Sequence, residues 1–177
     1  LPIHIGGFTN TFEYRGFDLS VFFQWSYGND LINYNRKLLE ELRGGHTNQL
    51  ATAVNHWTPR TVNADGTVTE GNYTNYLWAP TRGFYEPGFN TNREVEDASV
   101  LRLKTIQLGY NFPSKWLKKS GIKSFRIYLS GQDLITWTKY SGYDPEVSTR
   151  NSSMTRGFDY SAYPRSATYT VGVKMSI

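Results

Sequence analysis

The sequence of 177 residues predicts an all-β protein, namely about five antiparallel strands of a large transmembrane β-barrel. Three observations lead to this fold class. Several segments alternate between apolar and polar residues, the connections between them are short and long in turn, and aromatic residues make up 16% of the sequence. A barrel strand needs one face for lipid and one for a watery lumen, and aromatic rings favour both membrane interfaces.

The composition narrows the class of protein further. The mean hydropathy of −0.53 would suit a soluble domain, but alternating barrel strands also keep this average low. No run of about 20 apolar residues occurs, so the sequence predicts no helical span. Without cysteine, disulfides and thiolate metal sites are excluded. The net charge of +4 comes from scattered basic residues, and we expect no nucleic-acid partner.

The first two expected strands are joined by a tight turn at Arg15-Gly16. The first covers residues 3–14, where Ile5 and Phe8 fall in opposite phases, so that Gly6-Gly7 between them predicts a β-bulge. The second covers residues 17–27 and has an apolar residue at every odd position. This stripe is the clearest lipid-facing candidate: Phe17, Leu19, Val21, Phe23, Trp25 and Tyr27.

The third and fourth strands, at 100–112 and 125–137, alternate less regularly. In the third, the apolar phase changes near Lys104, which predicts either a second bulge or inward packing of the leucines before it. In the fourth, Asp133 interrupts an otherwise apolar face.

The fifth strand, at 167–177, alternates from Tyr169 to the last residue. Its pattern resembles the C-terminal β-signal that the bacterial barrel-assembly machinery reads. Ile177 stands where that signal usually has an aromatic residue. The residues that carry the likeness are Thr170, Gly172, Met175 and Ile177.

The connections predict the orientation of the strands. The turn at Arg15-Gly16 and the connection 113–123 are short, whereas 28–99 and 138–166 are long. Barrels have short periplasmic turns and long extracellular loops. Within the first long loop we expect a helix from Asn29 or Asp30 to about Arg43, and a β-hairpin turning at Asp65-Gly66. The connection 113–123 predicts one helical turn closed by Gly121.

Five strands cannot close a membrane barrel, whose smallest class has about eight. An open sheet in lipid would leave unpaired backbone groups along two edges. We therefore expect further strands, either upstream in a longer polypeptide or from several copies of this chain. The first alternative is favoured by the start at Leu1, without a methionine and already in a strand-like pattern.

Several short motifs resemble the C-terminal region of the SusC/RagA family of TonB-linked outer-membrane transporters of Bacteroidetes. They include Leu101-Arg102-Leu103-Lys104, Leu108-Gly109-Tyr110 and Thr138-Lys139-Tyr140, besides two signature segments. The signature residues are Ser130, Gly131, Gln132 and Asp133 in the first segment, and Gly142, Tyr143, Asp144, Pro145 and Glu146 in the second. Family members commonly have Asn in place of Asp133 and Phe in place of Trp137.

The resemblance implies a barrel of about 22 strands in the outer membrane of a Gram-negative cell. Members of the family are occluded by an N-terminal plug, energised by the TonB complex, and import glycans or oligopeptides captured by a surface SusD-like lipoprotein. The implied partners of residues 1–177 are therefore the rest of the barrel, its plug, that lipoprotein, the TonB complex and membrane lipid. Neither the plug nor the TonB-contacting segment lies within the sequence.

No catalytic, metal or cofactor site is predicted. The sequence has none of the usual catalytic motifs, and His4, His46 and His56 are too far apart for a ligand set. Asp144 and Glu146 fit a turn better than acid–base work or a cation site. Exposed rings in the long loop could instead stack on sugar, contact a lipoprotein or pack within the loop. They are Trp57, Tyr73, Tyr76, Trp78, Phe84 and Tyr85.

Two other functions remain compatible with the sequence. An aromatic-rich soluble or secreted β-domain that binds carbohydrate would bury the apolar faces of the second and fifth strands against another sheet. A non-transporting scaffold of the outer membrane would have the same strands. Within the importer hypothesis, glycan and peptide substrates stay open because such importers share their strands and differ in loops and plug.

Overall fold

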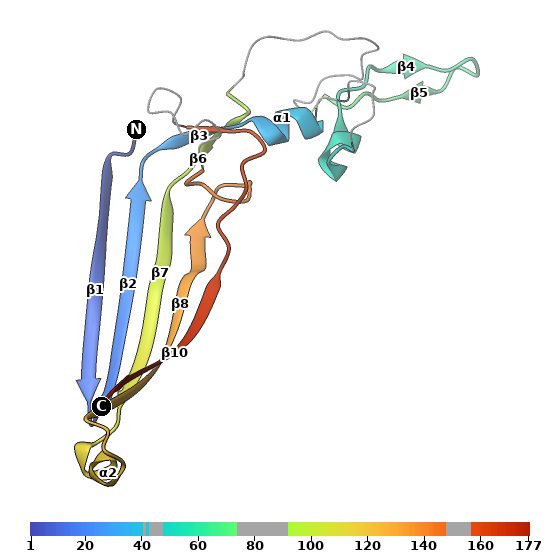
Figure 1. The fold of residues 1–177 in the computed structure, drawn as a ribbon. Coiled ribbons are helices and arrows are strands. Elements are labelled where there is room, and N and C mark those ends of the chain that lie inside the picture. Colours follow the sequence, from blue (N-terminus) through green and yellow to red (C-terminus); the bar gives the residue numbers. More distant parts are fainter. Residues whose placement is uncertain (41, 43–47, 74–91, 148–156) are drawn as a thin grey trace. The chain divides into compact units, whose positions relative to one another are not determined.

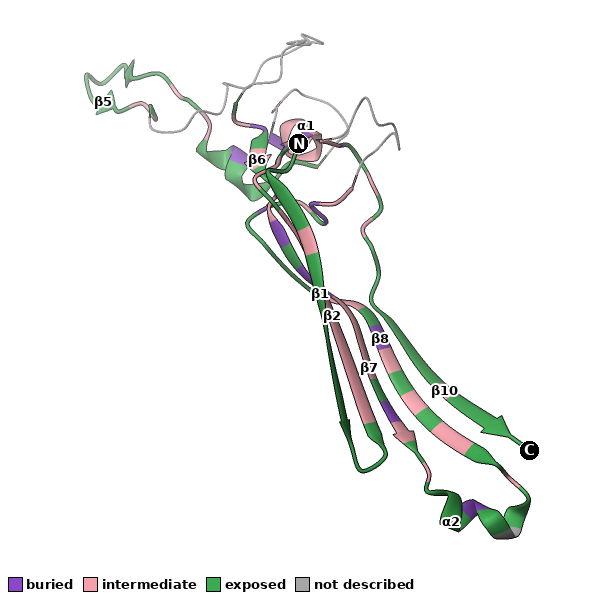
Figure 2. Ribbon diagram, turned by 90° about the vertical axis from the view of Figure 1, so that its left-hand side faces the viewer, coloured by how far each residue is buried: buried purple, intermediate pink, exposed green. Residues whose placement is uncertain are grey.

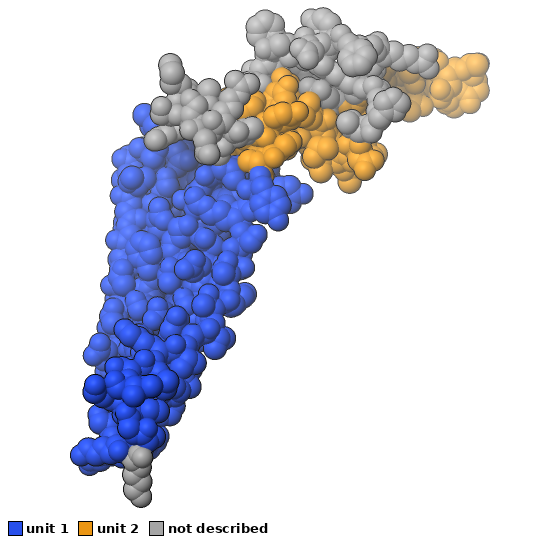
Figure 3. All heavy atoms as spheres, viewed as in Figure 1, with its two compact units in different colours: residues 1–30, 97–147, 163–177 blue, residues 31–96, 148–162 orange. Residues whose placement is uncertain are grey.

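The structure is a computed structural model that describes residues 1–40, 42, 48–73, 92–147 and 157–177 (Figure 1). The chain divides into two compact units, which Figure 3 shows in different colours. Unit 1 comprises residues 1–30, 97–147 and 163–177, and unit 2 comprises residues 31–96 and 148–162.

Unit 1 is a five-stranded antiparallel sheet in which each strand pairs with the next one along the sheet (Figure 1). This arrangement confirms the predicted fold class. The edge strands are exposed along nearly their whole length, whereas β2 is mostly half-buried (Figure 2). In sheet order, the strands are β1 (His4–Tyr14), β2 (Phe17–Tyr27), β7 (Val100–Asn111), β8 (Ser124–Thr138) and β10 (Thr168–Ser176).

The predicted bulge at Gly6-Gly7 is wrong. The pairing of β1 with β2 runs without a shift from His4 opposite Tyr27 to Tyr14 opposite Phe17. The two glycines make room for aromatic rings of β2 instead: a Cβ at Gly6 would collide with Trp25, and one at Gly7 would lie 2.9 Å from the ring of Phe22. The glycines therefore serve cross-strand packing, while Ile5 stays on the polar face.

The bulge predicted near Lys104 is present, and it replaces the alternative of inward packing. Leu103 pairs with Ile135 while Thr105 pairs with Gln132, so one residue of β7 faces two of β8. Against β2, Lys104 is an extra residue of β7, because Phe22 pairs with Thr105 and Phe23 with Leu103. This residue restores the phase of the apolar stripe in β7, so that leucines on both sides of it share one face. Asp133 occupies the bulge with a φ of 51°, in the left-handed region where Asp and Asn are the most tolerated side chains after glycine.

The two short connections of the sheet have the expected forms. Arg15 and Gly16 both have positive φ, 47° and 91°, as the central residues of a two-residue hairpin turn do. Between β7 and β8, α2 (Ser114–Leu117) continues into the 3₁₀ turn η2 (Lys118–Ser120), and Gly121 closes it with a φ of 73°.

Unit 2 includes most of the first long loop, and its described residues form short elements. The predicted helix is shorter than expected, because β3 (Asp30–Asn33) takes its first residues into a small sheet of order β6-β3-β9. The helix is α1 (Tyr34–Glu40), and the Asn33 side chain accepts from the Arg36 N–H at 3.0 Å as its N-cap. The other members are β6 (Val95–Asp97), β9 (Phe158–Asp159) and the 3₁₀ helix η1 (Ala51–Asn55).

The hairpin predicted in this loop is confirmed. β4 (Thr61–Val62) pairs antiparallel with β5 (Val68–Thr69). Gly66 has a φ of 81°, and the Asp65 carboxylate accepts from the N–H of Thr67 at 2.9 Å. These contacts hold the turn that the Asp-Gly pair predicts.

Candidate functional site

The sheet of unit 1 has two chemically distinct faces. On one face, paired positions of neighbouring strands carry apolar side chains from edge to edge, such as Val21 opposite Ile106 and Leu129 opposite Val171. These side chains are uncovered: Leu129 is 51% exposed and Val171 is 75% exposed. An apolar face of this extent marks contact with a membrane or another protein.

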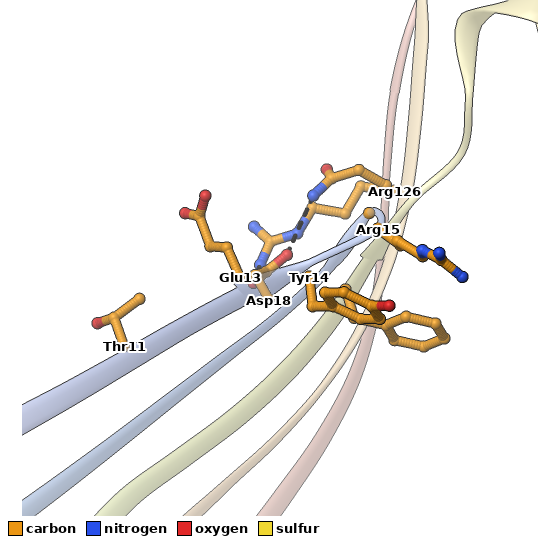
Figure 4. Close-up of a pocket in the computed structure, with 9 residues that line it drawn as sticks. Thr11, Glu13, Tyr14, Arg15, Asp18 and Arg126 are labelled. Atoms are coloured by element: carbon orange, nitrogen blue, oxygen red, sulfur yellow. Dashed lines mark hydrogen bonds and ion pairs between the residues drawn. The ribbon is translucent and has the colours of Figure 1, made fainter.

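The opposite face is polar, and near the short connections it is hollowed. A cavity of about 470 Å³ lies there, lined by residues of β1, β2, β7 and β8. In Figure 4, Asp18 and Arg126 point toward each other across the strand that separates them, and they form an ion pair. Asn111 donates to the same carboxylate at 3.1 Å. The polar face therefore presents charged groups that are held in place by one another.

Two glycines on this face make room for large side chains of neighbouring strands. The Arg126 guanidinium lies 5.7 Å from the ring centre of Tyr128, and that ring lies over Gly172 of β10. Gly109 leaves the space in which Asp18 meets Arg126. The glycines thus keep the polar face smooth enough for large side chains to lie flat along it.

A buried charge cluster occupies the other end of the polar face, and we name it the Arg102 cluster. Nη2 of Arg102 lies 2.6 Å from Oδ1 of Asp144, and its Nε lies 2.8 Å from Oε2 of Glu146. The Arg102 side chain is only 4% exposed. The cluster pairs three cations with three carboxylates, namely Arg102, Lys104 and Arg165 with Asp133, Asp144 and Glu146.

The Arg102 cluster orders the second signature segment. Asp144 also accepts from the backbone N–H groups of Glu146 and Arg165, at 3.0 and 3.3 Å. The Arg165 guanidinium binds Glu146 at 2.8 Å. These contacts join β7, the segment after β8 and the segment before β10. Because every carboxylate here is engaged by a cation, the arrangement fixes loops and offers no free acid or base.

The first signature segment forms the bulge described above. Ser130 and Gly131 pair with Thr170 and Tyr169 of β10, and Asp133 binds Nζ of Lys104 at 2.8 Å. Gln132, opposite Thr105, is the last residue of β8 paired with β7 before the bulge. In the second segment Pro145 is buried and Tyr143 is 85% exposed, and Gly142 leaves room for the ring of Tyr140.

Only part of the predicted loop aromatics can be placed. Trp57 and Tyr73 meet edge to face with ring centres 6.3 Å apart, and they are 41% and 58% exposed. The Tyr73 hydroxyl accepts from the Arg60 N–H at 2.9 Å. Tyr76, Trp78, Phe84 and Tyr85 lie outside the described residues. Contact of these rings with substrate or a partner stays a prediction.

The residues of the predicted assembly signal lie on or directly after β10. Thr170 and Gly172 face the polar side, and Met175 pairs with Phe125 on the apolar side. Ile177 follows the strand, and its carbonyl accepts from Nζ of Lys123 at 3.1 Å. Their role in assembly stays a prediction.

Unit 2 has its own charge cluster around Glu40, whose side chain is 5% exposed. Burial alone would raise the pKa of Glu40, but hydrogen bonds from Arg93 and Thr52 and the charge of Arg36 lower it below its ordinary value. Burial likewise opposes the charge of Arg36, yet the carboxylates of Glu40 and Glu96 raise its pKa. The cluster therefore holds the loop through charged groups that stay ionised at neutral pH.

The sequence placed Arg102 in a family motif but assigned no role to Arg102, Asp18 or Arg126. Each sits at a polar-face position of its strand, where a charged residue looks solvated. A signal was available for Arg102 alone, since two carboxylates around a proline in Asp144-Pro145-Glu146 require a cation if that loop is buried.

The described residues contain no group of three or more His, Asp or Glu side chains that could hold a metal ion. Among the same residues, no helix is long and apolar enough to cross a membrane.

Comparison with known proteins identifies the relatives of the chain. No model of a known protein family matches the sequence. It is 38% identical to TonB-dependent receptor P3 of Formosa agariphila over 174 residues, which is 96% of this chain and 16% of the receptor. It is 31% identical to TonB-dependent receptor P26 of the same organism over 99% of this chain and 17% of that receptor.

Two further matches name particular members of this group of receptors. The chain is 34% identical to TonB-dependent receptor SusC of Bacteroides thetaiotaomicron over 83 residues, 46% of this chain and 8% of SusC. The RagAB peptide importer in its open-open state matches the whole chain with a TM-score of 0.75 at 28% identity, over 17% of the matched chain. This chain belongs to the SusC/RagA family of TonB-dependent receptors.

The chain spans about one sixth of the length of the SusC/RagA relatives that match it along most of its length. Family membership therefore applies to the sheet and its loops. The matched relatives are receptors and importers.

Proposed function

We propose that the chain forms part of the wall of an outer-membrane, TonB-dependent nutrient importer of the SusC/RagA type. The observation that carries this proposal is the pair of opposite faces across five strands, one uncovered and apolar, the other polar and charged. In the importer the apolar face would meet lipid and the polar face would line the interior, against the plug.

The dimensions of the strands support a membrane span. From Phe17 to Trp25, β2 makes eight residue steps on the apolar face. At about 3.3 Å per residue and a tilt of about 40°, this distance covers roughly 20 Å of membrane thickness, near the apolar band of about 25 Å. Aromatic rings stand at both ends of this stretch, where the two interfaces would lie.

The structure disfavours the rival soluble domain. A carbohydrate-binding sandwich would cover the apolar faces of β2 and β10 with a second sheet. In the described part of the chain no second sheet lies on β10, where Val171 and Val173 are 75% and 60% exposed.

The relatives suggest the substrate class and the partner. RagAB is a peptide importer. The family resemblance implies a surface lipoprotein as partner, so we propose glycan or oligopeptide uptake with such a lipoprotein. Energy would come from the TonB complex through parts of the receptor outside residues 1–177. The long-loop end, which the Arg102 cluster orders, would face the lipoprotein.

Uptake by cells tests this function. The gene for the full-length receptor would be deleted, and the import of labelled oligosaccharides and labelled oligopeptides would be measured. We expect loss of one substrate class, restored by the intact gene but not by a copy that lacks the TonB-contacting segment. Unchanged uptake of both classes would favour a non-transporting scaffold and overturn the proposal.

A further inference from the structure

The connection between β7 and β8 differs from the rest of unit 1 in its chemistry. Residues 113–123 contain four lysines, at 115, 118, 119 and 123, and no acidic residue. Lys115, Lys118 and Lys123 are exposed. Arg15, on the neighbouring turn between β1 and β2, adds a further cation and lies 5.1 Å over the ring of Tyr14. The end of the sheet with the short connections is therefore a basic rim.

The charges of this basic rim are not neutralised within the fold. Among the described residues, no carboxylate forms an ion pair with Arg15, Lys115, Lys118 or Lys123. Two acidic side chains lie near the rim: Asp18 is engaged by Arg126 on the polar face, and Glu13, which lines the same cavity as Arg15, forms no ion pair with it. The rim is thus left to attract an anion from outside.

An aromatic group connects the basic rim with the apolar face. Phe17 lies 4.5 Å from Tyr110, Tyr110 lies 4.9 Å from Phe112, and Phe112 lies 5.0 Å from Phe125, measured between ring centres. Trp116 of α2 extends this group at 6.3 Å from Phe112. Its side chain is 67% exposed, although the adjacent Leu117 is buried.

Trp116 has an exposed indole among lysines, and its ring continues the aromatic group of the apolar face. This combination suits the headgroup region of a membrane. Tryptophan favours the level of lipid headgroups, and basic side chains beside it bind anionic headgroups. We propose that the turn 113–123 is a binding site for anionic phospholipid of the membrane leaflet on that side. Trp116 enters the interface, and Lys115 and Lys118 bind the phosphate.

This inference rests on the proposed function, since it requires the apolar face to lie in a membrane. It adds anionic phospholipid as a ligand of the receptor and makes the turn 113–123 the site that binds it. In the orientation expected from the short and long connections, the leaflet is the periplasmic one. The basic rim would then fix the depth and tilt of this part of the wall.

Lipid quenching of Trp116 tests the proposal in the full-length receptor, reconstituted into nanodiscs. The quenchers are brominated phosphatidylglycerol and brominated phosphatidylcholine at equal amounts, and the Trp116→Phe variant is subtracted to isolate the signal. We expect stronger quenching by the glycerol lipid. High salt should remove the difference, because screening weakens exposed charge pairs.

Two variants separate charge from fold. Lys115→Gln/Lys118→Gln should weaken the preference for phosphatidylglycerol about twenty-five-fold, since each basic residue near an anionic surface contributes about fivefold. Lys115→Arg/Lys118→Arg, which keeps the charge, should retain it. Equal quenching by both lipids, or a preference that survives the glutamine variant, would overturn the inference.

The same samples report on the proposed function separately. A folded barrel migrates differently on a gel before and after heating, and this shift measures insertion. Failure to insert would contradict the membrane function itself. Insertion without a lipid preference would contradict only the lipid site.

Discussion

Nη2 of Arg102 lies 2.6 Å from Oδ1 of Asp144, although the two residues are 42 positions apart in the sequence. Both side chains are almost completely buried, at 4% and 3% exposed. A buried guanidinium and carboxylate depend on each other, because either one alone would be an uncompensated charge. This pair therefore links the order of the 144–146 segment to strand β7.

Arg102→Met should release the second signature segment while leaving the sheet intact. Loss of one partner from a buried pair costs about 3–5 kcal/mol. Hydrogen–deuterium exchange of residues 139–147 in the full-length receptor would report the change. Arg165→Met is the matched control and should have a smaller effect, because that side chain is 41% exposed. Equal protection in wild type and Arg102→Met would contradict the role of the cluster.

Asp133 tests whether the bulge or the charge matters at that position. Asp133→Asn should be tolerated, since asparagine adopts positive φ readily, whereas Asp133→Val should cost about 1–2 kcal/mol or more in the left-handed region. The yield of heat-modifiable barrel in membranes measures this difference. If asparagine were as damaging as valine, the pair with Lys104 would be the decisive feature.

Gly172 and Tyr128 form a testable pair on the polar face. Gly172→Val should impair the barrel, because its side chain would collide with the ring of Tyr128. Tyr128→Ala should relieve that defect in the double variant. The interaction energy from the double-mutant cycle is the measurement. A defect that persists without the ring would point to the assembly signal as the reason for the glycine.

Adjacent residues of β10 can separate the two faces. Val171→Arg would place a charge on the apolar face and should cost about 2–4 kcal/mol near the middle of the membrane, whereas Thr170→Arg on the polar face should cost much less. Folding equilibria of the full-length receptor into lipid vesicles, followed in denaturant, measure both. The reverse order would invert the assignment of the faces.

The lowered pKa of Glu40 predicts that the first long loop is sensitive to acid around α1 and η1. Its contribution is fully present above the ordinary value of 4.5, because the carboxylate is ionised in both states there, and it is lost as the pH falls through the lowered pKa. Glu40→Gln at neutral pH should mimic the acid form. Exchange of residues 34–40 and 51–55, corrected for intrinsic rates, should rise in both cases. An acid-insensitive loop in the wild type would exclude this role.

Local patterns were sufficient for the strands, the hairpin at Asp65-Gly66 and the glycine-closed turn at Gly121. Each depends on a period of two residues or on a backbone angle that few residues adopt. The helix predicted in the first loop was longer than the observed one. The residues expected to begin it instead pair with β6 and β9, which are distant in the sequence. The prediction of a bulge at Gly6-Gly7 was wrong for a similar reason, because rings of the neighbouring strand occupy the space that those glycines leave.

By itself, the sequence determined that the chain has two-faced strands joined by short and long connections, and it carried the motifs of the SusC/RagA family. The tertiary structure alone decided which charges meet. Alternation places Arg102, Asp18 and Arg126 on the polar face, but the partner of each depends on register across strands and on loops that return from 40 to over 100 residues away. Register comes from the packing of whole strands, which no single segment encodes.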